Sequence, residues 1–293
     1  MKFTTSIAMI NPAFYVPVAQ AAEAAGFEGI NLPDSIGYPK ESDSTYPYNG
    51  DGSREFLENK PFIEPLIATA AMAAATTSIM FRTAVLKLPV RHPVIFAKEV
   101  TSLAVMTGNR FGLGIGTSPW PDDYELVGLP WAARGRRFEE CIAILQGLST
   151  GEYLEYDGEF YRFPAVKLNP APTEPVKLII GGHTDRHIER TARLGDGWAP
   201  TGISTDEVAK VVARIHARRA ELGRDHLPFE VHAGNADSRS VDGIKRLAEA
   251  GVTHVGGSFS TFNPYGLGPD TETLQQKVDA LQRFGDEVIS HFR

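Results

Sequence analysis

Short apolar runs alternate along this chain with longer segments in which apolar residues recur every three or four positions. The first pattern is typical of buried parallel strands, and the second of helices that pack on a sheet. Strands are predicted at 3–10, 28–33, 78–88, 110–115, 176–180, 197–200, 229–233 and 254–259. Helices are predicted at 18–27, 63–77, 93–107, 134–149, 184–194, 205–222, 240–250 and 271–289. Eight strand–helix pairs favour an α/β fold closed into a (β/α)8 TIM barrel over an open doubly wound sheet, within one domain spanning residues 1–293.

Two insertions interrupt this repeat. Residues 34–62 form a long polar and aromatic segment after the second strand, and residues 150–175 separate the fourth helix from the fifth strand. In the second insertion, "YLEYDGEFYRF" alternates around Asp157-Gly158, which predicts a hairpin. Long loops in a compact fold are usually functional or disordered. We interpret 34–62 as a substrate lid, with a disordered surface insertion as the alternative. The aromatic residues that favour a lid are Tyr38, Tyr46, Tyr48 and Phe56.

The overall charge and the single cysteine narrow the class of protein. A formal net charge of −7, with no run of lysine and arginine, argues against nucleic acid or an anionic membrane surface as a partner. Cys141 is the one cysteine, and its place in a helical pattern indicates a small buried residue. The N-terminus does not resemble a signal peptide, and no apolar run approaches the ~20 residues of a membrane span. We therefore expect a cytoplasmic protein that acts on a small molecule.

Paired glycines, Gly181 and Gly182, stand between a predicted strand and a predicted helix. Because they lack side chains, their backbone amides can approach an anion, and the helix N-terminus adds favourable polarity. The pair therefore predicts a phosphate cradle, with His183 and Thr184 as further donors. A tight turn that needs only a positive φ is the alternative interpretation.

A second glycine-containing turn follows the fourth predicted strand. Gly116 ends that strand, and Thr117 and Ser118 supply hydroxyl groups. The pattern is not a dinucleotide fingerprint, because no third glycine opens a helix. The acids just beyond it are expected on a solvated face or at a helix N-terminus, with a catalytic role as the lesser alternative. These acids are Asp122, Asp123 and Glu125.

Asp34 directly follows the second strand, and a carboxylate at the carboxyl end of a barrel strand is a catalytic candidate by position. A loop cap before Ser35 is the structural alternative. His232 ends the seventh strand and is expected either to face the barrel mouth or to make a structural hydrogen bond. The eight histidines show no HxH or HExxH spacing, so no metal site is indicated. No GxSxG or Walker motif supports a hydrolase or a kinase.

Four stretches in order carry a family resemblance: "RTAVLKLPVRHPVIFAKEVTSLAVMTGNRFGLGIG" (82–116), "DDYELVGLPWAARGRRFEECIAIL" (122–145), "GEFYRF" (158–163) and "IIGGHTDRHIERTARLGDGWAPTG" (179–202). Together they resemble the luciferase-like superfamily of flavin- and deazaflavin-dependent oxidoreductases, and most of all its branch that uses the deazaflavin coenzyme F420. The resemblance implies an (β/α)8 barrel with insertions, in agreement with the strand count.

The resemblance also implies roles for individual residues. A non-proline cis peptide is expected at Ala84–Val85, behind the cofactor ring, with Thr83 beside it. Gly116, Thr117 and Ser118 would lie along the ring or its ribityl chain. The phosphate would be held by Gly181, Gly182 and His183, with Thr201 and Gly202 nearby.

The activity implied is hydride transfer between C5 of F420 and an unidentified organic substrate. An FMN-dependent monooxygenase on the same barrel is the first alternative, and a cofactor-binding protein without turnover is the second. The sequence departs from the family where relatives carry a proton-donating histidine or a glutamate, because Ser35 and Pro119 stand at those positions. Asp34, a tyrosine of the 34–62 insertion or solvent would then manage the proton. The resemblance leaves a homodimer open, because dimers are common among relatives.

Overall fold

Eight parallel strands close into a barrel in the computed structural model, which describes residues 1–46, 51–257 and 270–293. The pairing order is β3-β2-β1-β11-β10-β9-β8-β5, and a further pairing of β3 with β5 closes the ring. These strands are β1 (Lys2–Ser6), β2 (Gly29–Leu32), β3 (Met80–Thr83), β5 (Phe111–Gly116), β8 (Leu178–Gly181), β9 (Gly197–Ala199), β10 (Glu230–Ala233) and β11 (His254–Gly257). The predicted (β/α)8 barrel is therefore confirmed.

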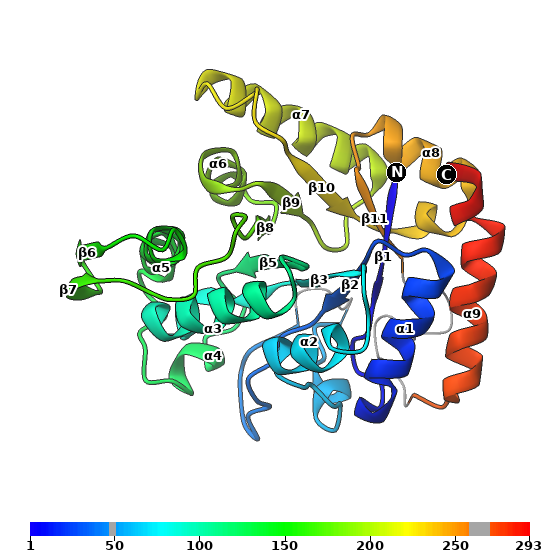
Figure 1. Cartoon of the computed structure of the whole chain (residues 1–293), viewed down its shortest axis with the longest axis horizontal. Helices are drawn as coiled ribbons and strands as arrows, with labels where there is room; N and C mark the ends of the chain where they lie inside the picture. Colours follow the sequence, from blue (N-terminus) through cyan, green and yellow to red (C-terminus); the bar gives the residue numbers. More distant parts are fainter. Residues whose placement is uncertain (47–50, 258–269) are drawn as a thin grey trace.

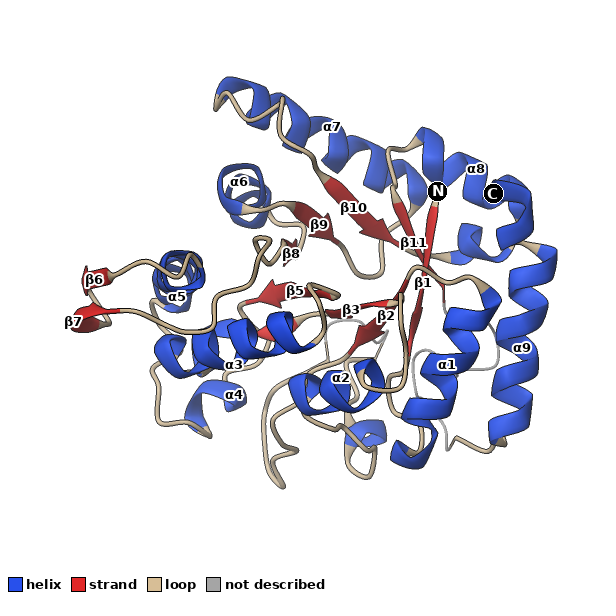
Figure 2. Ribbon diagram, viewed as in Figure 1, coloured by secondary structure: helices blue, strands red, loops and turns tan. Residues whose placement is uncertain are grey.

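Helices surround the strands, as Figures 1 and 2 show. They are α1 (Tyr15–Ala25), α2 (Pro65–Ala73), α3 (Pro93–Met106), α4 (Asp122–Glu125), α5 (Arg134–Ser149), α6 (Asp185–Leu194), α7 (Thr205–Glu221), α8 (Val241–Glu249) and α9 (Leu274–Glu287). Their ends follow local chemistry. The left-handed residue Gly26, with a φ of 89°, ends α1, and a reciprocal Ser204–Glu207 capping box begins α7. Within the described residues, no helix combines the length and the apolar character that a membrane crossing requires.

The third predicted strand, 78–88, is divided in the structure. β3 ends at Thr83, and a two-residue strand, β4 (Leu86–Lys87), continues beside β5. The Ala84–Val85 peptide between them is cis, which confirms the bond that the family resemblance implies. The first strand also stops earlier than predicted, at Ser6 rather than residue 10, because a turn leads into a 3-10 helix (Pro12–Phe14) capped by Asn11.

The two insertions take different positions. The predicted hairpin is confirmed as β6 (Leu154–Asp157) and β7 (Arg162–Val166), an antiparallel pair on the outer side of α5 (Figure 1). The described part of the 34–62 insertion contains one 3-10 helix (Glu55–Leu57). Tyr48, and residues 258–259 at the end of the eighth predicted strand, lie outside the described residues.

Candidate functional site

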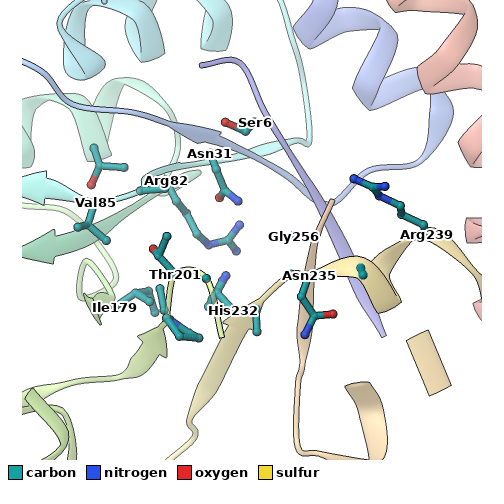
Figure 3. Close-up of a pocket in the computed structure, with 18 residues that line it drawn as sticks. Ser6, Asn31, Arg82, Val85, Ile179, Thr201, His232, Asn235, Arg239 and Gly256 are labelled. Carbon is teal, nitrogen blue, oxygen red and sulfur yellow. The ribbon is translucent and has the colours of Figure 1, made fainter. Parts of the chain in front are cut away.

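A cavity lies at the carboxyl ends of the barrel strands, where TIM-barrel enzymes place their active sites. It has two chambers of about 370 Å³ and 380 Å³. The inner chamber is lined by Arg82, Val85, His232 and Asn235 among others (Figure 3). The outer chamber reaches the 34–62 insertion and the ends of β5 and β8. The walls common to both chambers are Ser6, Ala84, Val85 and Thr201.

The cavity brings together nearly all of the residues expected at the site. Ala84, Val85 and Thr201 line both chambers, and Thr83 and Gly202 line the inner one. The outer chamber adds the predicted residues Asp34, Gly116, Thr117, Ser118, Gly181 and Gly182. His183 differs from the expectation. Its side chain is exposed and lines neither chamber, because it precedes the first turn of α6.

His187, four residues after His183, lines the outer chamber in its place. Gly182 has a φ of 99°, and a Cβ built there would lie 2.7 Å from the His187 ring. The Gly182 carbonyl accepts a hydrogen bond from Trp198 Nε1 at 2.7 Å. The positive-φ turn is therefore confirmed at Gly182, and the pair lines the cavity without side chains, while phosphate binding stays a prediction.

Asp34 lies at the predicted strand end, but its carboxylate is fully engaged. The two Asp34 oxygens accept hydrogen bonds from the Arg91 guanidinium at 2.8 and 2.9 Å, and one of them also accepts the Lys87 backbone N–H at 2.8 Å. The Asp34 side chain is 1% exposed. This arrangement favours a positioning role for Asp34, which fixes β4 next to Val85, over a role as a free acid.

Asp123 lies in the first turn of α4, as one of the two interpretations predicts, but it is not on a solvated face. Its side chain is 1% exposed, and its carboxylate accepts hydrogen bonds from Lys87 Nζ at 2.8 Å and from the Ser118 hydroxyl. Ser118, with a φ of 67°, also accepts the Trp120 backbone N–H at 3.0 Å. The Ser118 hydroxyl is thus held by protein contacts, and the turn after β5 is fixed by a buried ion pair between Lys87 and Asp123.

The described part of the 34–62 insertion packs over the outer chamber. Trp120 Nε1 donates a hydrogen bond to the Thr45 carbonyl at 3.0 Å, and the ring centroids of Tyr46 and Trp120 are 5.9 Å apart. The Arg54 guanidinium lies 5.2 Å from the Tyr38 ring centroid and 3.5 Å from Asp122. These contacts favour the interpretation of this insertion as a cover for the cavity over a disordered loop.

A charged cluster lies inside the barrel beneath the inner chamber. Arg82 donates two hydrogen bonds to Glu28 at 2.7 and 2.8 Å, and His232 Nε2 lies 2.8 Å from a Glu230 carboxylate oxygen. The His232 and His254 rings stack with centroids 4.1 Å apart. Glu230, His232 and His254 are close enough to hold a metal, but the cations Lys177 and Arg82 already compensate the carboxylates. Of these residues, sequence analysis identified only His232.

Comparison with known proteins agrees with this geometry. A family model described as luciferase-like monooxygenase matches residues 4–235. The chain belongs to the luciferase-like monooxygenase family. Protein Rv0940c of Mycobacterium tuberculosis (strain ATCC 25618 / H37Rv) is 51% identical over 290 residues, which cover 99% of each chain. The F420-dependent glucose-6-phosphate dehydrogenase of Nakamurella multipartita is 28% identical over 203 residues, which cover 68% of this chain and 55% of that protein.

Solved structures of other proteins share the barrel. The monooxygenase RslO1 from Streptomyces bottropensis superposes with a TM-score of 0.76 at 15% identity, over the whole of both chains. The coenzyme F420-dependent tetrahydromethanopterin reductase from Methanopyrus kandleri superposes with a TM-score of 0.74 at 16% identity, over 100% of this chain and 99% of that one. At these identities the likeness describes the fold of this luciferase-like protein and not its substrate.

Proposed function

We propose that this protein is an F420-dependent oxidoreductase that transfers a hydride between C5 of the deazaflavin and an organic substrate. The observation that carries the proposal is a bare wall beside Val85. A Cβ added at Gly116 would lie 3.0 Å from a Val85 methyl group, and one at Gly181 would lie 3.1 Å from the other. The two strand ends therefore lack side chains so that Val85 can pack directly on them, and the opposite side of Val85, which lines both chambers, is a flat wall against which a ring could lie. F420-dependent relatives support the choice of cofactor.

The lining residues fit a cofactor with a flat ring and a phosphate-bearing tail. Ala84 and Val85 would back the ring, and Thr117 would lie along it. Gly181, Gly182, Thr201 and Gly202 would surround the phosphate with backbone groups and one hydroxyl. Bound there, F420 would supply a carbon centre that accepts or donates hydride. The protein's part is to hold the ring, orient the substrate and exclude water under the 34–62 insertion.

An FMN-dependent monooxygenase is the second candidate, because the family model carries that description. The two are separated by titrating the protein with F420 and with FMN under the same conditions. We expect F420 to bind with low micromolar affinity and FMN more weakly. Tighter FMN binding, together with substrate-dependent oxygen consumption in the presence of a flavin reductase, would favour the monooxygenase instead.

Gly182→Ala should weaken F420 binding at least tenfold, or about 1.4 kcal/mol. The added methyl group would meet the His187 ring at 2.7 Å, and the φ of 99° is unfavourable for alanine. Gly128→Ala is the matched control, because Gly128 also has a positive φ, 68°, but has no neighbour within 4 Å of the new Cβ. Fluorescence titration should show the control unchanged. Equal losses in both variants would mean that backbone strain alone explains the effect.

A homodimer formed through α2 and α3 is a further proposal. A groove between these helices carries large exposed apolar side chains, with Ile67 67%, Ile95 60% and Met106 80% exposed. Exposed apolar groupings of this kind mark association surfaces. Light scattering after size exclusion should report a dimer for the native chain and a monomer for the Ile67→Glu/Ile95→Glu variant. A monomeric native chain would contradict the proposal.

A further inference from the structure

His232 stands at the floor of the inner chamber and is 9% exposed (Figure 3). Its Nε2 lies 2.8 Å from a carboxylate oxygen of Glu230. An ionised carboxylate can only accept hydrogen bonds, so Nε2 must carry the proton in this pair. In the neutral imidazole the other nitrogen, Nδ1, then holds an open lone pair. No hydrogen bond to Nδ1 is present among the described residues.

The surroundings keep Glu230 ionised and His232 neutral. Burial alone would raise the pKa of Glu230, but hydrogen bonds from His232 and Lys177 hold that pKa well below its usual range. Burial lowers the pKa of His232 to about 4, although the Glu230 hydrogen bond opposes this shift. The charges of Arg82 and the stacked His254 ring also disfavour the imidazolium. At neutral pH, His232 therefore presents an uncharged acceptor to the cavity.

Three other polar groups that line the outer chamber are already engaged by the protein. Asp34 and Ser118 are held by protein hydrogen bonds, and the Lys87 ammonium is paired with Asp123. Among the described residues that line the inner chamber, the other ionisable side chains are those of Arg82 and Arg239. A guanidinium group has no lone pair that could accept a proton. His232 is thus the base that the inner chamber holds, on the same cavity walls as Ala84 and Val85.

Glu230 connects this base to the other end of the barrel. Glu230 is the first residue of β10, and it contacts Lys177, which immediately precedes β8. The Lys177 side chain is 52% exposed. The contacts His232–Glu230–Lys177 therefore run from the cavity floor to solvent at the amino-terminal end of the strands. Glu230 also orients the imidazole and would stabilise its protonated form, as a carboxylate does for a catalytic histidine.

We propose that His232 is the general base for oxidation of an alcohol substrate, an assignment that rests on the proposed F420-dependent function. The carbinol C–H bond breaks with its electron pair, which passes as hydride to C5 of the deazaflavin. The O–H bond breaks at the same carbinol group, its proton passes to His232 Nδ1, and the carbonyl double bond forms. The alcohol is oxidised, the deazaflavin is reduced, and the proton stays on the His232 imidazolium, beside the Glu230 carboxylate, until water takes it from Nδ1 after the product has left.

The first test reads the proton positions directly. The measurement is imidazole nitrogen NMR of 15N-histidine-labelled protein, with the His232 signals assigned by comparison with His232→Asn. Nδ1 of His232 should be unprotonated between pH 5 and pH 8, because this range lies about one unit or more above the His232 pKa of about 4. Adding propan-2-ol or cyclohexanol to the F420-loaded protein should shift this Nδ1 resonance as it accepts a hydrogen bond. In Glu230→Gln the proton should distribute over both nitrogens. A proton on Nδ1 of the native protein, or no response to either alcohol, would overturn the proposal.

The second test uses turnover, followed as loss of the oxidised F420 absorbance with the same alcohols. His232→Asn should lower kcat by about 10²- to 10⁴-fold and leave the Kd for F420 within about twofold. His226→Asn, at an exposed position, is the control and should match the native chain. A native rate in His232→Asn, or a loss confined to F420 affinity, contradicts the assignment. Failure of the native chain to bind F420 would instead reject the proposed function. The position of the His232 proton in the NMR spectrum of the protein without F420 would then still test the neutral acceptor separately.

Discussion

Gly114→Ala is expected to lower the free energy of unfolding by about 3 kcal/mol and to abolish F420 binding. A Cβ at this position would lie 1.9 Å from the Thr83 carbonyl oxygen and 3.0 Å from its carbonyl carbon. The Thr83 hydroxyl also donates a hydrogen bond to the Gly114 carbonyl at 2.6 Å, so the two strands cannot separate without losing it. The Thr83 carbonyl is a backbone group, so it cannot move away from the new methyl group by changing rotamer. Accommodating the methyl group must displace the end of β3 and the Ala84–Val85 wall of the cavity.

Gly112→Ala supplies the matched control on the same strand. A Cβ at Gly112 has its nearest neighbour, Arg82 Cγ, at 3.6 Å, which is ordinary contact. Urea unfolding should therefore place Gly112→Ala close to the native chain and Gly114→Ala well below it. Titration with F420 should follow the same order. Native-like F420 affinity in Gly114→Ala would mean that the end of β3 does not border the cofactor site.

The order of the elements could be predicted from the sequence because each depends on local pattern. Buried parallel strands are short apolar runs, and the helices that cover them repeat at 3.6 residues. Gly26 and the Ser204–Glu207 pair mark helix ends within a few residues of the pattern that they terminate. The division of residues 78–88 has no such signal, because "MFRTAVLKL" continues as an apolar run through Ala84 and Val85. The cis bond there could be expected only from the family resemblance.

The buried ion pairs of the site could not be predicted from the sequence, for a different reason. Asp123 lies among acids and looks like part of a solvated face, whereas its partner Lys87 is 36 residues away. Glu28 and Arg82 are 54 residues apart. Such pairs are created by the tertiary packing of distant segments and leave no local periodicity. His183 and His187 illustrate a smaller error, because the start of α6 decides which of two histidines turns towards the cavity.

The second large effect is expected at Asp34, where a structural and a catalytic role give different results. Asp34→Ala should lower the free energy of unfolding by about 3–5 kcal/mol. It would leave the Arg91 guanidinium, 18% exposed, without its bidentate partner and the Lys87 amide without its acceptor. Glu64, with an oxygen 3.8 Å from Arg91, could compensate only in part. A free catalytic acid would show a different pattern, with native stability and lost turnover.

A double-mutant cycle with Asp34→Asn and Arg91→Met separates these roles. Asp34→Asn keeps an acceptor for the Lys87 amide but removes the negative charge, so each single variant should unfold at lower urea concentration than the native chain. Because the two side chains form one ion pair, the double variant should be less destabilised than the sum of the singles, by about 1–3 kcal/mol. F420 binding should recover in parallel, since both effects act through the position of β4. Additive losses of stability, or a loss of turnover in Asp34→Asn at native stability, would instead assign the carboxylate to the chemistry.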